Sequence, residues 1–206
     1  MNILFFSDFH NCVDLSRLKD VFLTCPYPDI VFVLGDISAR ELIAIKEIIG
    51  TTPIYGVLGN HDGPTLLEFV EIPNIHCKRV DIAGISFSGF QGSVRYKRGP
   101  YTMFTQKESL DVMAAIPAAD IFISHDRSFC GKKLDVSVEY SKSPHEGLAG
   151  ISAYLQQHLP SLHVHGHIHN NARYVFHGID TISVFGAVFI SFENKSIKDY
   201  RILLEL

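Results

Sequence analysis

The stretch NILFFSDFH, residues 2–10, is an apolar run that ends in two side chains able to bind a metal ion. The run from Asn2 to Ser7 is typical of a fully buried strand. Asp8 and His10 follow at i and i+2, so on extended backbone both point to the same side and can reach one ion. A carboxylate and an imidazole together suit manganese, iron, zinc, cobalt or nickel. A single Asp-x-His pair is weak evidence, and its meaning depends on the rest of the chain.

The same pattern, a buried strand followed by metal-binding residues, recurs four times further along. We expect strands at 29–34, 53–58, 120–124 and 161–165, followed by Gly35-Asp36, Gly59-Asn60-His61-Asp62, His125-Asp126 and Gly166-His167-Ile168-His169. A carboxylate such as Asp36 can bridge two cations, Asn60 offers a carbonyl oxygen, and His61 suits a general acid near neutral pH. Metal ligands at the ends of several strands predict one site assembled by the fold. His165 is expected to be packed rather than to bind the metal.

The rest of the chain predicts a mixed architecture. Helical spacing is found at 13–24, 38–49, 105–116 and 145–158, and a short helix is expected after Pro64 to about Val70. Strand patterns are found at 75–90, with a turn near 81–84, and at 172–177, 179–184, 187–192 and 197–204. Ser38 and Glu41 have capping-box spacing, and Gly50 should close that helix. Residues 91–104 and 126–144 are expected to be loops. Two sheets packed together with helices outside satisfy this pattern, and we expect residues 1–206 to form one domain.

Composition excludes several classes of protein. Hydrophobic residues make up 47% and charged residues 19%, as in an ordinary folded chain, and the net charge of -4 does not suggest a strongly basic nucleic-acid binder. The densest basic stretch, 95–98, is expected to be a solvated loop rather than a substrate contact. Cysteines 12, 25, 77 and 130 show no paired spacing, which fits a reducing cytosol. We expect a cytoplasmic protein with no membrane span or signal segment.

Taken in order, the motifs D-x-H, GD, GNHD, H and GHxH resemble those of the calcineurin-like metallophosphoesterase family, and they run from residue 8 to residue 169. As a set they are specific, although each is weak alone. The resemblance implies an α/β (α+β) fold, a four-layer αββα sandwich of two mixed β-sheets flanked by helices. It also implies a small phosphorylated substrate, a phosphomonoester or phosphodiester.

The resemblance further implies two divalent metal ions, with Mn2+ expected first and Fe, Zn, Co or Ni as alternatives. The first ion would be bound by Asp8, His10, Asp36 and His169, and the second by Asp36, Asn60, His125 and His167. Asp36 would bridge them. A metal-bridging hydroxide would attack phosphorus, and His61 would protonate the leaving oxygen as general acid.

One departure from the family pattern bears on the substrate. Phosphoprotein phosphatases of this family carry GDxxDRG, whereas here Ala39 replaces the second Asp and Glu41 the glycine. This points away from protein phosphatases and leaves two points open: whether Arg40 contacts phosphate and whether Asp62 orients His61. Two alternative functions are a nuclease acting on DNA or RNA, which the mildly acidic chain does not favour, and a non-catalytic protein-binding scaffold. The substrate and the oligomeric state are not readable from the sequence.

Overall fold

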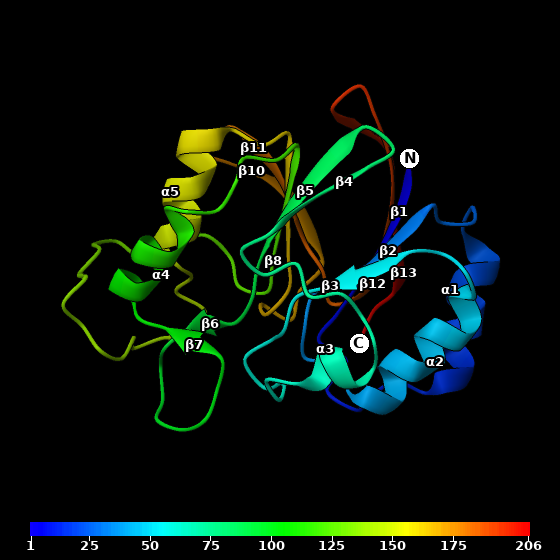
Figure 1. Cartoon of the computed structure of the whole chain (residues 1–206), viewed down its shortest axis with the longest axis horizontal. Helices are drawn as coiled ribbons and strands as arrows, with labels where there is room; N and C mark the ends of the chain where they lie inside the picture. Colours follow the sequence, from blue (N-terminus) through cyan, green and yellow to red (C-terminus); the bar gives the residue numbers. More distant parts are fainter.

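The computed structural model describes residues 1–206 as two β-sheets packed face to face, with helices on both outer faces (Figure 1). The first sheet has the order β13–β12–β1–β2–β3. Its strands are β1 (Asn2–Ser7), β2 (Ile30–Val33), β3 (Ile54–Gly56), β12 (Gly186–Glu193) and β13 (Ser196–Leu204). The expected four-layer αββα sandwich of two mixed sheets is therefore confirmed.

The second sheet has the order β10–β11–β9–β8–β5–β4. Its strands are β4 (Arg79–Ile82), β5 (Ile85–Phe90), β8 (Ile121–Ser124), β9 (Leu162–His165), β10 (Ala172–Phe176) and β11 (Ile179–Ser183). Two short strands, β6 (Ser93–Val94) and β7 (Met103–Phe104), form a separate pair, in a segment that the sequence predicted to be loop throughout. The loop 95–102 joins them.

Alternation along the strands explains the layers. In β1, Ile3 and Phe5 face the second sheet and belong to the apolar cluster between the sheets. Leu4 and Phe6 point to the opposite face, as the two-residue period of a strand requires. There they meet α1 (Leu15–Thr24), α2 (Ala39–Ile49) and α3 (Leu66–Phe69). The outer face of the second sheet is covered by α4 (Gln106–Met113) and α5 (Ala149–His158), at the left of Figure 1.

Parallel pairing places the carboxyl ends of several strands at the same edge of each sheet. β1, β2 and β3 run parallel in the first sheet, and β5, β8, β9 and β11 run parallel in the second. Hydrogen bonds then tie the two groups of strand ends to each other: His167 donates its backbone N–H to Asp8 at 2.7 Å, and the His125 ring bonds the Leu34 carbonyl at 2.7 Å. The loops that carry the predicted ligands therefore meet at one end of the sandwich.

The start of α2 is set by the residues that the sequence indicated. The Ser38 hydroxyl accepts the Glu41 N–H, and the Glu41 carboxylate accepts the Ser38 N–H at 2.9 Å, which confirms the capping box. Gly50 ends the helix with φ +57°, a conformation that favours glycine. The capping box therefore fixes the start of α2 shortly after Asp36.

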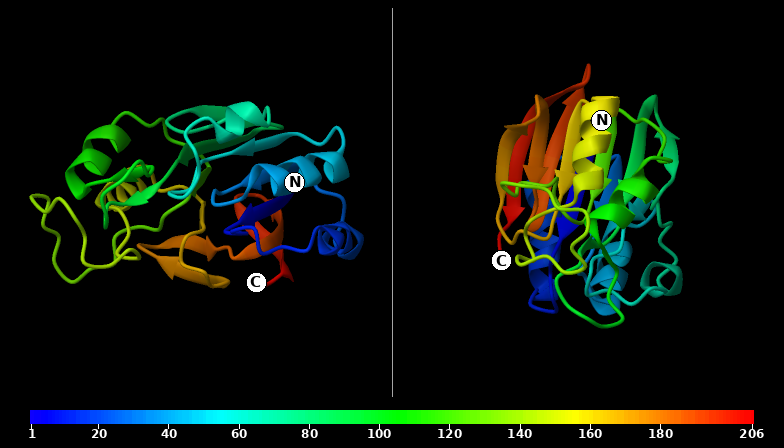
Figure 2. Two further views of the ribbon diagram at one scale, coloured as in Figure 1. Left: turned by 90° about the horizontal axis from the view of Figure 1, so that it is seen from below. Right: turned by 90° about the vertical axis from the view of Figure 1, so that its left-hand side faces the viewer.

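The helix predicted at 145–158 is wrong at its start, because α5 begins at Ala149. Residues 145–148 are instead bound to the backbone of 127–130: Leu148 donates to the Arg127 carbonyl at 3.0 Å, and Cys130 donates to the Glu146 carbonyl at 2.9 Å. Gly147 has φ +78°, which the helix does not allow. This pairing closes the long segment 126–148, which projects at the left of Figure 2. No helix in the structure has both the length and the apolar character to span a bilayer.

Candidate metal centre

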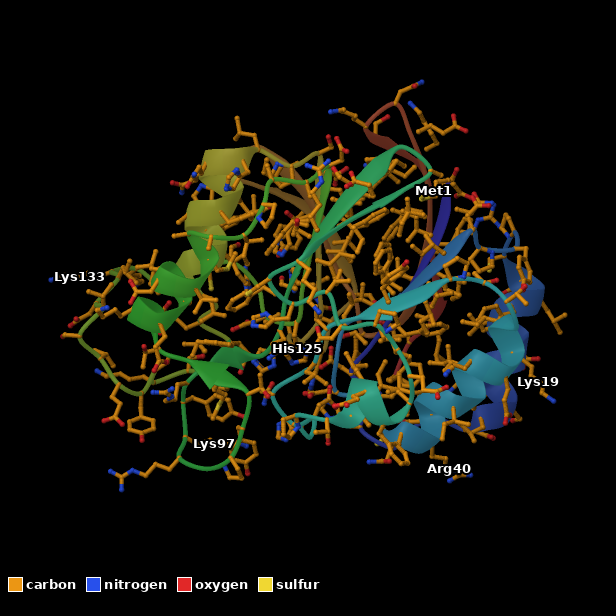
Figure 3. All side chains as sticks on the ribbon, in the orientation of Figure 1. Met1, Lys19, Arg40, Lys97, His125 and Lys133 are labelled. Carbon is orange, nitrogen blue, oxygen red and sulfur yellow. The ribbon has the colours of Figure 1, made fainter.

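All seven predicted metal ligands lie in loops after β1, β2, β3, β8 and β9, and the structure brings them together at one end of the sandwich. Asp8 and His10 follow β1, and Asp36 follows β2. The others, in chain order, are Asn60, His125, His167 and His169. His125 is labelled near the middle of Figure 3 and is completely buried.

The first group of donor atoms contains Asp8, His10 and His169, all within 4.8 Å of one another. His10 Nε2 lies 2.9 Å from His169 Nε2. Asp8 Oδ1 lies 3.7 Å from the first of these nitrogens and 3.6 Å from the second. Two ligands at about 2.0–2.2 Å from a shared ion are roughly 3–3.5 Å apart. The three atoms therefore nearly have the spacing that one cation requires.

The second group contains Asp36, His125 and His167, again within 4.8 Å of one another. Asp36 Oδ2 lies 3.5 Å from His125 Nε2. Asn60 Oδ1 approaches the same nitrogen to 3.0 Å. Every member of this second set is buried, so a cation held there would be largely out of contact with bulk water.

Asp36 stands between the two groups. Its Oδ2 is 3.5 Å from His125 Nε2 and 4.0 Å from His10 Nε2, while its Oδ1 accepts the His61 backbone N–H at 2.9 Å. Asp36 Oδ2 and Asp8 Oδ1 are buried without any hydrogen-bond partner. A buried carboxylate oxygen in that condition is costly unless a cation meets it. The donor set therefore fits a pair of divalent cations.

Hydrogen bonds on the far side of the ligands fix their orientation. The Leu34 carbonyl accepts from His125 Nδ1 at 2.7 Å, and the Pro144 carbonyl accepts from His167 Nε2 at 2.9 Å. Each bond occupies one ring nitrogen and leaves the other directed toward the centre. Asp8 Oδ2 accepts from the Ser7 hydroxyl at 2.6 Å, which turns Oδ1 inward.

The backbone at the centre is unusual. Five of the seven predicted ligands have positive φ, between +50° and +66°, in the left-handed region: Asp8, His10, Asp36, His167 and His169. Few residues other than glycine adopt this region, and such conformations concentrate at functional sites, where the surrounding structure holds them. The strand ends are therefore bent so that the ligands converge.

The charges of the centre are strongly coupled. Burial alone would raise the pKa of Asp36, but the adjacent His125 imidazole holds that pKa well below its usual range. Burial alone would lower the pKa of His125, yet Asp36 raises it. For Asp8, burial is again opposed by a hydrogen bond from His169 and by the His125 charge, and the pKa is lowered. Two buried anionic carboxylates thus require positive charge beside them.

His61 lies at the edge of the centre and is exposed. Its ring packs edge-on against the ring of His10, with centroids 5.7 Å apart, and against that of Tyr101, at 5.9 Å. Partial burial lowers the pKa of His61; Asp36 opposes this, and Lys97 adds to it. The ring is thus within reach of a ligand bound at the ions without occupying a ligand position itself.

Three residues in or beside the motifs take no part as ligands: Asp62, His165 and Arg40. Asp62 Oδ2 accepts the N–H groups of Gly59 and Asp36, at 2.7 and 2.9 Å, so its carboxylate joins two ligand loops rather than contacting the His61 ring. His165 is buried and bonds Tyr174 through Nε2 at 2.7 Å, as a packed residue should. Arg40 is exposed on α2 and lies away from the centre in Figure 3.

The sequence missed one residue of the centre. The ring of His145 lies 5.1 Å from that of His167 and 6.2 Å from that of His169, centroid to centroid. It follows Pro144, whose carbonyl accepts from the His167 ring, so two successive residues of this loop contact His167. Proximity of a histidine to a proline is no signal by itself, and nothing local marked His145.

Comparison with known proteins agrees with this geometry. The family model described as calcineurin-like phosphoesterase matches residues 1–185. Among curated proteins, none matches the chain. Among solved structures, the protein TT1561 of Thermus thermophilus is similar with a TM-score of 0.66 and 15% identity, over 98% of this chain and 99% of that one.

Two further solved structures have the same fold. A novel archaeal phosphodiesterase matches with a TM-score of 0.54 and 15% identity, over 98% of each chain. A putative 5'-nucleotidase from Staphylococcus aureus, in complex with alpha-ketoglutarate, matches with a TM-score of 0.56 and 14% identity, over 97% of this chain and 53% of that one. At such identities these likenesses bear on the fold alone. On the family match, the ordered motifs and the converging ligands, this chain belongs to the calcineurin-like phosphoesterase family.

Proposed function

We propose that this protein is a dinuclear metal-dependent phosphoric ester hydrolase, which cleaves a phosphomonoester or phosphodiester of a small phosphorylated molecule. One observation carries the proposal. Buried, unpartnered oxygens of Asp8 and Asp36 face the ring nitrogens of His10, His125 and His169, in a chain of a phosphoesterase family.

The first ion would be held by Asp8, His10 and His169, and the second by Asn60, His125 and His167, with Asp36 Oδ2 shared between them. Two divalent ions, with manganese as the first candidate and iron, zinc, cobalt or nickel as alternatives, would acidify water and offset negative charge on the phosphoryl oxygens. The ligands come from both sheets, which supports our further proposal that residues 1–206 work as one domain.

His61 protonates the oxygen of the departing group. The Asp36 carboxylate accepts the His61 backbone N–H at 2.9 Å, so the residue that would be shared by the two ions also fixes the backbone of the acid. The contact with the His10 ring keeps His61 on the His10 side of the centre. His145, whose ring lies against those of His167 and His169, is placed to donate a hydrogen bond to a phosphoryl oxygen from another side.

The test uses the protein loaded with Mn2+ and two generic aryl esters, phenyl phosphate and diphenyl phosphate, whose phenolate leaving group is basic enough to need protonation. Because a positioned general acid contributes about 10²–10⁴-fold, His61→Asn should lower turnover by that factor and leave bound manganese unchanged. His177→Asn is the matched control, since His177 is exposed in the turn between β10 and β11. Metal-replete protein that turns over neither ester, nor any other mono- or diester, would contradict the proposal.

A further inference from the structure

We propose that the loop 95–102 binds the leaving group of the substrate and selects a leaving group that carries a phosphate of its own. This inference rests on the proposed role of His61, because the acid must lie beside the departing oxygen. Side chains packed against His61 are therefore the ones placed to contact the leaving group.

The loop 95–102 lies directly against the acid. The Tyr101 ring meets the His61 ring edge-on at 5.9 Å. The Tyr96 hydroxyl accepts from the side-chain amide of Asn60, at 3.4 Å, although 36 positions separate these two residues in the chain. Two tyrosines of one loop thus contact two neighbouring residues of the GNHD motif.

The loop carries cations that no carboxylate neutralises. Lys97 Nζ lies 3.9 Å from the centre of the Tyr101 ring and 5.1 Å from that of Tyr96, a cation–π arrangement. Arg98 lies 5.9 Å from the ring of Tyr140. Neither cation has a carboxylate oxygen within 4.0 Å, whereas Arg95 is paired with Glu108 at 2.8 Å. Lys97 and Arg98 are therefore available to an anionic ligand.

A pocket of about 240 Å³ opens between these side chains. Arg95, Lys97 and Arg98 contribute to its wall together with the rings of Tyr101 and Tyr140, and no acidic residue does. The whole chain has a net charge of -4, so this basic, aromatic pocket is a local departure from the average. Labelled Lys97 marks the loop at the lower edge of Figure 3.

The loop is held in place at both ends. The buried Asp126 carboxylate accepts the Val94 N–H at 2.9 Å, Arg95 donates its N–H to the Phe104 carbonyl at 2.8 Å, and Ser93 donates to the Thr102 carbonyl at 3.1 Å. A pre-positioned cation costs little reorganisation when charge arrives. A leaving group with its own phosphate gains from Lys97 and Arg98, and one without charge gains nothing from them.

The experiment measures binding, so that it does not depend on turnover. Adenosine 3',5'-bisphosphate and adenosine 5'-monophosphate are titrated by calorimetry into Mn2+-loaded protein carrying His61→Asn, which slows their consumption during the titration. The two ligands differ by one phosphate on the leaving group. We expect the bisphosphate to bind about tenfold more tightly, the scale of one charge-assisted contact.

Lys97→Ala and Arg98→Ala, each added to that background, should reduce this ratio toward one, while Lys19→Ala, an exposed lysine on α1, should leave it unchanged. Equal affinities for the two ligands, or a ratio that survives both substitutions, would overturn the inference. Fructose 1,6-bisphosphate, measured against fructose 6-phosphate, separates phosphate recognition from base recognition. The same tenfold gain there supports a phosphate site that accepts sugars as well as nucleotides.

Failure of this binding experiment can be told apart from failure of the hydrolysis test. A tenfold gain that depends on Lys97 and Arg98, in a protein that hydrolyses no ester, would contradict the proposed chemistry alone. Hydrolysis of aryl esters without any gain from the second phosphate would contradict this inference alone.

Discussion

Gly166, between His165 and His167, is the position where one added methyl group should disturb the candidate metal centre most. A Cβ atom built there would lie 2.0 Å from Ser7 Oγ and 2.5 Å from Asp8 Oδ2. Ordinary contacts of this kind are about 3.4 Å or longer, so the β9 loop or Asp8 has to move by roughly 1 Å. Gly166 has no positive φ, so alanine is not excluded by its backbone and the effect is one of space.

The loss of stability expected for Gly166→Ala can be worked out from the contacts that the added methyl group disturbs. Overpacking a dense site costs about 1–3 kcal/mol, and loss of the buried bond from Ser7 to the Asp8 carboxylate adds about 1.5–3 kcal/mol. We therefore expect Gly166→Ala to lower the free energy of unfolding by about 2.5–6 kcal/mol, measured by urea denaturation in the presence of a chelator. Because Asp8 Oδ1 loses its orientation, the affinity for Mn2+, measured by calorimetry, should fall by about 10–100-fold.

Gly63→Ala is the matched control, since Gly63 lies beside the GNHD motif and an added Cβ meets nothing within 4 Å. Its unfolding free energy should stay within about 0.5 kcal/mol of the unsubstituted protein. If Gly166→Ala behaves like this control in both assays, the contact between the β9 loop and Asp8 does not hold the centre. A loss of stability with unchanged Mn2+ affinity would refute the link between that contact and the metal.

Three further predictions concern metal and pH. Mn2+ at a hundredfold excess over its dissociation constant should raise the unfolding free energy by about 2.7 kcal/mol, because it meets the unpartnered oxygens of Asp8 and Asp36. Identical melting curves with manganese and with chelator would contradict this. Asp36→Asn should reduce bound manganese to less than two equivalents by metal analysis, since Asp36 Oδ2 lies near both groups of donor atoms. Two bound equivalents would show that a bridging carboxylate is not needed. Burial lowers the pKa of His76 to about 4, so the stability from its neutral ring is complete above about pH 6.5 and is lost as the pH falls toward 4, by about 3 kcal/mol. In chelator, His76→Gln should flatten that part of the stability profile, and an unchanged profile would disprove the assignment.

The fold was predictable to the extent that its signals are local. The buried runs that became β1, β2, β8 and β9, and the caps of α2, depend on residues close together in the chain. The start of α5 was not predictable, because residues 145–148 are drawn into backbone pairing with 127–130, a contact that no helical pattern reveals. Competition between a local helix and a distant partner is decided by tertiary packing.

The candidate site divides in the same way. Carboxylate, amide and imidazole groups directly after strands could be recognised by type and spacing, and the structure brings those residues together. His145, Lys97 and Tyr101 lie in segments without periodicity, and they reach the site only because those loops are tied back to it. The sequence also offered Asp62 as a partner for His61, whereas its carboxylate binds two backbone N–H groups instead.

Residues a few positions apart were enough to specify the succession of buried strands and the kinds of donor atoms at their ends, because strand periodicity and ligand chemistry are local. The orientation of those donor atoms toward one centre is decided by tertiary packing. Packing bends Asp8, Asp36 and His167 into left-handed backbone, leaves one oxygen of each carboxylate free, and sets a basic, aromatic loop beside His61. The reason is physical: such conformations are unfavourable in isolation and persist only where contacts from distant parts of the chain hold them.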